Sequence, residues 1–290
     1  MSGCGRLRWK LIVTIVIGVI LSTHAAFYCV SAEEFSVVIS SDVQNADETF
    51  VVEVLNGKSQ QTNLRRSVLI YHTHTYEAYE QEPEVLYQET EKWRTKDSRY
   101  NVVAVGEALA RSLTALGIEV THDMTSFEPP SLEQAYDRSR IMLEERKQNG
   151  EVYDLIIDLH RDALSNQSTI KKTVNIGGED VARFMVLIGQ GITGGYTEKP
   201  DWKKNLLLAQ TITQSLNAQC DGLARNIKIK TGRFNQHISD RCVLIECGMN
   251  TNTLDEVMAG IPYLAEAIKQ ALTPEVEKNP VEMNSAGNED

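Results

Sequence analysis

Residues 68–80 read VLIYHTHTYEAYE, an apolar run that passes directly into a polar turn. The segment Ser67–Tyr71 has the β-branched and aromatic content that is typical of a buried strand. His72 and His74 follow it, and Glu77 comes three residues after the second histidine. Ligands of open α/β sheets bind beyond the carboxyl ends of the strands. The stretch therefore predicts a strand that carries metal ligands to a binding edge, against the alternative of a strand that merely ends in polar residues.

Strand and helix patterns alternate along the rest of the chain as far as residue 272. Residues 102–116 have helical spacing and end before Gly117, a residue type that is common just after helices. Residues 153–160 and 241–248 are apolar almost throughout, as strands buried on both faces are. The expected helices are 102–116, 131–150, 203–219 and 254–272; the expected strands after 67–71 are 118–122, 153–160 and 241–248.

Two further β-rich segments, 168–176 and 182–189, are separated by Gly177 and Gly178, which predicts a hairpin. Strands that alternate with helices indicate an α/β fold with a mostly parallel central sheet flanked by helices. The hairpin adds antiparallel members, so we expect a mixed sheet.

The amino terminus has a different character from the rest of the chain. Three basic residues precede the apolar stretch Leu11–Val30, which has the length of about 20 residues that a membrane-spanning helix needs. The basic flank predicts a cytoplasmic start and an extracytoplasmic remainder. The sequence VSAEE at 30–34 also fits a signal-peptidase site, so a retained anchor and a cleaved signal both stay open. The expected regions are a cytoplasmic tail 1–10, an anchor or signal segment 11–32, a stalk 33–66, a folded domain 67–272 and a disordered tail 273–290.

Charge and cysteine content exclude two classes of protein. The net charge is −11, and residues 1–32 contain no acidic residue, so the remainder is still more acidic. Phosphate backbones repel such a domain, which argues against nucleic acid as a partner. Cys220, Cys242 and Cys247 form no CxxC pair, which argues against a disulfide framework or a cysteine metal site.

Three expected strand ends could together hold a metal ion. His74 and Glu77, three residues apart, can reach one metal from a tight turn, and His160 ends the strand 153–160. Two histidines and a glutamate form a ligand set that is known from zinc peptidases. The fourth position would hold water, and Glu246 at the end of strand 241–248 could take its proton and pass it to a leaving amine.

These motifs, in this order, resemble the stage II sporulation protein P family. The similar stretches are IYHTHTYEAY, RYNVVAVGEAL, GIEVTHDMT, DLHRDA and FNQH…VLIECGMNTNT, which lie within about residues 65–270. The resemblance implies that 67–272 is a zinc amidase domain with a fold shared with zinc carboxypeptidases. The family's implied activity is cleavage of the amide between muramic acid and the stem peptide of peptidoglycan, with an endopeptidase activity on stem cross-links also associated with it. Engulfment of the forespore is the implied setting, and stage II sporulation proteins D and M are the implied partners.

The family's site residues fall on particular positions of this chain. The resemblance implies His74, Glu77 and His160 as zinc ligands and Glu246 as the catalytic glutamate. Asp97 is an alternative second ligand, because it precedes Asn101 by four residues, the spacing of a ligand glutamate in related amidases.

Further residues have two open interpretations each. Arg161 could stabilise an oxyanion, or it could form a surface ion pair. Asn235 and His237, in RFNQH, could contact substrate from a loop. His72 could orient the metal ligands by hydrogen bonds, or it could be structural, whereas His122 is expected on a solvated face.

Three functions remain from the sequence. The main prediction is a membrane-anchored zinc amidase with its catalytic domain outside the cytoplasm. A peptidase that cuts between stem residues is the second. An inactive peptidoglycan-binding scaffold is the third, and the presence of all four residues at 74, 77, 160 and 246 argues against it.

Overall fold

The computed structural model describes residues 66–165 and 169–273. The expected cytoplasmic tail, the anchor or signal segment 11–32, nearly all of the stalk 33–66 and the tail beyond Thr273 lie outside these residues. Within the described ranges, no helix is both long enough and apolar enough to cross a membrane.

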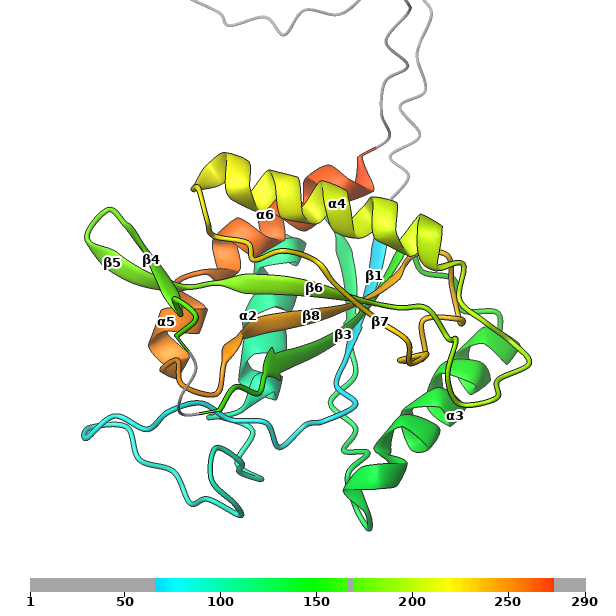
Figure 1. Cartoon of the computed structure of the whole chain (residues 1–290), viewed down its shortest axis with the longest axis horizontal. Coiled ribbons are helices and arrows are strands. Elements are labelled where there is room, and N and C mark those ends of the chain that lie inside the picture. Colours follow the sequence, from blue (N-terminus) through cyan, green and yellow to red (C-terminus); the bar gives the residue numbers. More distant parts are fainter. Residues whose placement is uncertain (1–65, 166–168, 274–290) are drawn as a thin grey trace, which may run out of the picture. The chain divides into compact units, whose positions relative to one another are not determined.

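A six-stranded mixed sheet forms the centre of the domain (Figure 1). Four of its five strand pairings are parallel, and only the pairing of β6 with β8 is antiparallel. The expected mixed, mostly parallel sheet is therefore confirmed. The strand order is β2 (Glu119–His122), β1 (Ser67–Tyr71), β3 (Leu155–Asp162), β8 (Cys242–Met249), β6 (Phe184–Gly189) and β7 (Lys228–Lys230).

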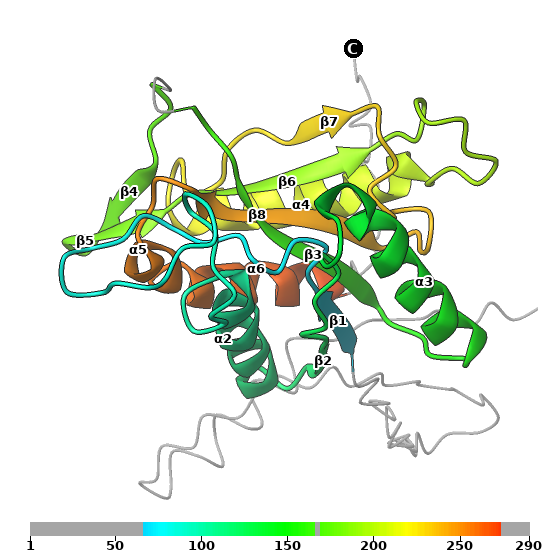
Figure 2. The ribbon, with the colours of Figure 1, turned by 90° about the horizontal axis from the view of Figure 1, so that it is seen from below.

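Helices cover the two faces of the sheet unequally. Because strand side chains alternate between faces, Val68 and Ile70 of β1 pack into a large apolar core, whereas Leu69 and Tyr71 enter a smaller cluster on the other face. The large core receives α2 (Val102–Ala115), α4 (Trp202–Gln219), α5 (Leu254–Met258) and α6 (Ile261–Leu272). The smaller cluster receives α3 (Ala135–Gln148), as Figure 2 shows.

The hairpin has a different second strand from the one predicted. β4 (Thr173–Ile176) pairs with β5 (Glu179–Ala182) in a separate two-stranded sheet. Gly177 and Gly178 both have positive φ, 64° and 98°, as a two-residue turn of this kind requires. Because the turn is so short, the return strand starts at Glu179. The prediction that 182–189 pairs with β4 was therefore wrong. The segment 184–189 becomes β6 and supplies the antiparallel member of the central sheet.

Other boundaries also differ from the sequence pattern. The expected helix 254–272 is two helices, because the chain breaks at Gly260, where a Cβ atom would lie 2.6 Å from the Phe184 ring. The expected helix 131–150 begins with a 3-10 turn at Leu132–Gln134, and the Ser131 side chain caps nothing. Strand β7 has only three residues, all exposed, and it was not among the expected strands.

The segment between β1 and α2 has no regular secondary structure and runs along the carboxyl edge of the sheet (Figure 1). Isolated bridges hold it, from Glu77 to Arg94 and from Ala78 to Asn101. The side chain of Asn101 caps α2 by accepting from the Val103 amide at 3.0 Å and donates to Thr95 O at 3.0 Å. These contacts fix the turn that carries His74 and Glu77.

Candidate active site

His160 and Glu246 are direct neighbours across two central strands. They are register partners in the parallel β3–β8 pair. Leu159 and Ile245, which precede them, belong to the large core, so the alternation of strand side chains places His160 and Glu246 on the opposite face, toward α3. Only their location at one edge of the sheet was predicted, from the two strand ends.

His74 approaches His160 from the turn after β1. The centroids of the two imidazole rings are 5.4 Å apart, at an interplanar angle of 85°. Tyr136, in the first turn of α3, lies beside both: its ring is 5.5 Å from that of His74 and 6.5 Å from that of His160. The rings of His74 and His160 are therefore close enough for both to reach one ion.

Glu77 contacts His160 directly. Its Oε2 lies 3.2 Å from His160 Nδ1 and accepts from the Arg161 amide at 3.1 Å. Burial by itself raises the pKa of Glu77, but the charges and hydrogen bonds of His160, with the charge of Arg161, outweigh it and lower that pKa to about 2. Glu77 is therefore an ionised, buried carboxylate, as a ligand of a hard or borderline cation must be.

Asp158 occupies the other side of the His160 ring. Its Oδ1 lies 2.8 Å from His160 Nε2, although the pair is not aligned as a hydrogen bond. Thr73 donates to Asp158 from its amide at 2.9 Å and from its hydroxyl at 2.7 Å. Burial lowers the pKa of His160, but Asp158 and Glu77 together raise it well above its usual value.

Glu246 is a buried carboxylate with an unpaired oxygen. The residue is 8% exposed, and its Oε2 has no hydrogen-bond partner within the described residues. Burial raises the pKa of Glu246 to about 8; Glu77 adds to the rise and His160 opposes it. An unpaired buried polar atom costs free energy unless a ligand satisfies it, so this oxygen points to a role in binding or proton transfer.

The residues fit a metal ion only in part as they stand. In the described ranges, no group of three or more His, Cys, Asp or Glu side chains is arranged to hold one. The 3.2 Å between His160 Nδ1 and Glu77 Oε2 is nevertheless close to the separation of about 3.3 Å expected for two tetrahedral ligands at about 2.0 Å from zinc. His74 Nδ1 is also buried, and it has no hydrogen-bond partner within the described residues. The chemistry of the donor set and this unpaired nitrogen fit a zinc ion.

Asp97, the alternative ligand, occupies a different environment from Glu77. It forms a bidentate pair with Arg99, with 2.9 and 2.6 Å between the bonded atoms, and its side chain is 31% exposed. Glu77, by contrast, contacts His160. The geometry favours Glu77.

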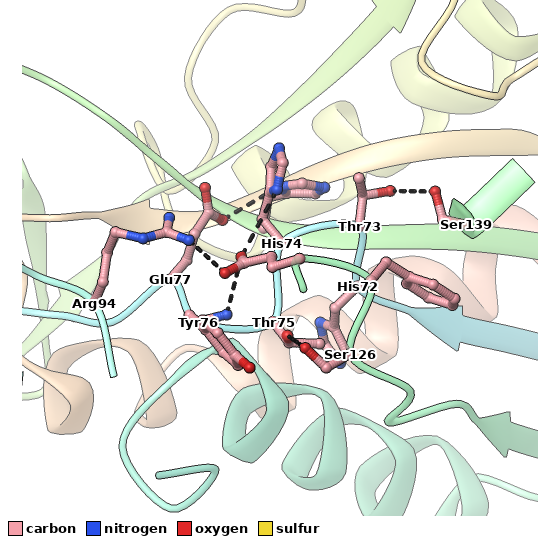
Figure 3. Close-up of polar contacts among 12 residues, drawn as sticks. His72, Thr73, His74, Thr75, Tyr76, Glu77, Arg94, Ser126 and Ser139 are labelled. Carbon is pink, nitrogen blue, oxygen red and sulfur yellow. Dashed lines mark hydrogen bonds and ion pairs between the residues drawn. The ribbon is translucent and has the colours of Figure 1, made fainter. Parts of the chain in front are cut away.

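His72 and His74 point to different parts of the molecule (Figure 3). His72 Nδ1 lies 2.9 Å from Leu159 O, and its Nε2 lies 2.8 Å from Nε2 of His122. Gly106 of α2 leaves room for this pair, because a Cβ atom there would lie 2.6 Å from both Nε2 atoms. His72 is thus a fully buried histidine on the α2 side, and His122 is its partner rather than a solvated residue.

Arg161 holds the turn after β1 in place. Its Nε donates to Ala78 O at 3.0 Å and its guanidinium donates to Trp93 O at 3.2 Å. The residue is 6% exposed, so the interpretation as a surface ion pair was wrong. Its role as an oxyanion group stays a prediction. The two nitrogens named here already donate to backbone carbonyls.

Replacing Arg161 by methionine should therefore affect stability more than turnover. We expect Arg161→Met to lower the free energy of unfolding by about 3 kcal/mol, because two backbone carbonyls lose a donor and Glu77 loses the guanidinium 4.0 Å from its Oε1. Arg99→Met is the matched control, since solvent screens that exposed pair and its loss should change the stability little. Urea unfolding measures both. An unchanged stability with a large fall in kcat would instead support the oxyanion role.

Asn235 and His237, the predicted substrate contacts, lie on the loop before β8. Asn235 is buried and its amide donates to Tyr136 O at 2.9 Å and to Ser139 Oγ at 3.0 Å, so it fixes the start of α3. His237 has no hydrogen-bond partner for either ring nitrogen in the described chain. Burial, and then Arg233, lower the pKa of His237 to about 4. Substrate contact stays a prediction for both residues.

Three residues beside the site were missed from the sequence. Asp158 had a usable signal, because it precedes His160 by two residues in a strand and so shares its face. Tyr136 and Glu128 had none. Glu128 Oε1 accepts from the Tyr76 amide at 3.2 Å and lies 3.7 Å from His74 Nδ1, while its Oε2 accepts from Arg94 at 2.5 Å. These contacts join segments that are far apart in the chain.

Solved structures that are similar to this chain include two amidases. The N-acetylmuramoyl-L-alanine amidase from Clostridium difficile 630 is 17% identical, with a TM-score of 0.43 over 71% of this chain and 94% of that one. The CwlD amidase from Clostridioides difficile, solved in complex with the GerS lipoprotein, is 15% identical, with a TM-score of 0.44 over 71% of this chain and 96% of that one.

Sequence comparison gives a more specific result. Stage II sporulation protein P from Bacillus subtilis (strain 168) is 26% identical over 222 residues, which are 73% of this chain. The matched part is 52% of that relative, so the chain corresponds to about half of its length. The family model described as Stage II sporulation protein P (SpoIIP) matches residues 31–269. This match extends over most of the chain, including the strands and the turn that carry His74, Glu77, His160 and Glu246, and the chain therefore belongs to the stage II sporulation protein P family.

Proposed function

We propose that the chain is a zinc-dependent peptidoglycan hydrolase that cleaves the amide between N-acetylmuramic acid and L-alanine during spore engulfment. Membership of the sporulation family supports a role in peptidoglycan hydrolysis. One observation carries the chemistry: His74 and Glu77 from the turn after β1 meet His160 of β3, which is beside Glu246 of β8.

The described side chains have separate tasks in this proposal. His74, Glu77 and His160 would hold the zinc ion, and Asp158, whose Oδ1 lies 2.8 Å from His160 Nε2, would orient the His160 ring. Bound zinc supplies polarisation of the scissile carbonyl and activation of water. Glu246 accepts the proton of the attacking water on its unpaired Oε2 and delivers it to the nitrogen of the leaving amine.

The location and the partners of the protein belong to the same proposal. The basic residues before Leu11–Val30 support a single-pass anchor with the catalytic domain outside the cytoplasm. An extracytoplasmic domain has access to peptidoglycan. Stage II sporulation proteins D and M, which the family resemblance implies, are the proposed protein partners.

Digestion of purified sacculi tests the activity. The full chain in detergent should release whole stem peptides and leave free lactyl ends on the glycan, and mass spectrometry identifies both products. A chelator should stop the release, and added zinc should restore it. Severed cross-links without free lactyl ends would identify an endopeptidase. Binding to sacculi without any cleavage, in a protein that contains no zinc, would identify a scaffold.

A further inference from the structure

Arg225 is a buried arginine that lies outside the group of residues assigned above. It follows Ala224, which forms a bridge with Phe184, and its own amide donates to Phe184 O at 2.7 Å. The residue is 8% exposed. Its backbone is therefore fixed against the start of β6, on the far side of β8 from His160.

The side chain of Arg225 reaches back across β8. One terminal nitrogen donates to Asp162 Oδ2 at 2.6 Å, and Asp162 belongs to β3. The same nitrogen lies 3.2 Å from the sulfur of Met185, which is the register partner of Glu246. Because β8 lies between β3 and β6, the guanidinium crosses the strand that carries Glu246.

One donor of this guanidinium has no partner among the residues that the structure describes. Arg225 Nε is buried and makes no hydrogen bond within the described residues. The equivalent nitrogen of Arg161 donates to Ala78 O, and that of Arg183 donates to Gly222 O. A buried charged donor without a partner is costly, so the contact with Asp162 alone does not account for an arginine here.

We propose that Arg225 binds a carboxylate of the substrate beside Glu246. The inference rests on the proposed function and names its ligand as the free carboxylate on the acidic residue that follows the alanine of the stem peptide. A guanidinium presents its donors as a planar fork that matches both oxygens of a carboxylate. Asp162 holds one terminal nitrogen and orients the fork, which leaves Nε for the substrate.

Two soluble muramoyl peptides that differ only at this carboxylate test the proposal. One carries the free acid and the other the primary amide. The full-length protein should prefer the free acid, and Arg225→Gln should lower kcat/KM for the acid on the order of 10–100-fold, mainly through KM, because a hydrogen bond to a charged group is lost. The amide should change little. Arg183→Gln, at a neighbouring arginine whose Nε already has a partner, should leave the acid-to-amide ratio unchanged.

Each other result contradicts the proposal in a recognisable way. Equal losses for the acid and the amide in Arg225→Gln would show a purely structural arginine. If that variant does not fold, the wild-type protein still decides, because equal kcat/KM for the two peptides excludes a carboxylate contact. If the wild type cleaves neither peptide, the proposed function is wrong. Calorimetric binding of the same two peptides then tests Arg225 separately, and equal affinities would overturn its role.

Discussion

Glu246→Gln should bind zinc as the wild type does and yet lose activity on the order of 10²- to 10⁴-fold in kcat, the range for removal of a general acid–base group. Glutamine keeps the size and the shape of the side chain but cannot accept the proton of the attacking water. The residue is buried beside His160 and keeps an oxygen without a partner in the described chain. Its replacement by a neutral amide therefore should not lower the melting temperature.

Three measurements on Glu246→Gln separate catalysis from folding. Metal analysis gives the zinc content, thermal unfolding gives the stability, and release of stem peptides from sacculi gives the rate. Glu107→Gln is the control, because Glu107 is exposed on α2 and forms an ion pair with Arg111 of the same helix. A full rate in Glu246→Gln would remove Glu246 from the proton transfer.

Glu77→Gln should lose bound zinc, whereas Asp97→Asn should keep it. Glu77 is buried against His160, and an amide there removes the anionic ligand. Loss of a residue that only supports a zinc ligand costs about 10–100-fold in affinity, so loss of the ligand itself should exceed about 100-fold. Asp97 is paired with Arg99 at the surface, and its loss should change zinc affinity less than about twofold.

Titration with a competing chelator measures both zinc affinities. Activity should follow zinc content, so Glu77→Gln should be inactive at zinc concentrations that saturate the wild type. Urea unfolding of the zinc-free proteins shows whether Glu77→Gln has lost the turn, since Glu77 also accepts from the Arg161 amide. The reverse result, with zinc lost in Asp97→Asn alone, would make Asp97 the ligand and Glu77 a structural residue.

The parts of the fold that depend on local pattern were predictable. The strand at Ser67–Tyr71 has the bounds that its β-branched run indicated, and α2 ends within one residue of the prediction. The location of His160 and Glu246 at one edge of the sheet followed from their places at the ends of two buried apolar runs, whereas the pairing of their two strands did not. Asp158 could have been added by the same argument, because alternate residues of a strand share one face.

The differences from the sequence pattern have two causes. The strand partner of β4 follows from the local two-residue turn at Gly177 and Gly178. The break at Gly260 and the direction of His72 involve contacts between segments that are distant in the chain. His72 turns toward α2 because Gly106 leaves room for it and His122 offers a partner, and neither is indicated near residue 72. The sequence did not show the contacts of Arg161, because the two carbonyls that it binds belong to an irregular loop.

The amino-acid sequence alone determined which residue types could perform hydrolysis, and which strands bring them to one edge of a mixed sheet. Hydrophobic periodicity and the alternation of strands with helices along the chain are local properties, and they suffice for that result. Only the tertiary structure decided which carboxylate meets His160, that Asp158 and Tyr136 flank the histidines, and that Arg225 reaches across β8 to Asp162. The physical reason is that hydrogen bonds and burial of charged groups depend on distance in space, which the order of residues along the chain does not specify.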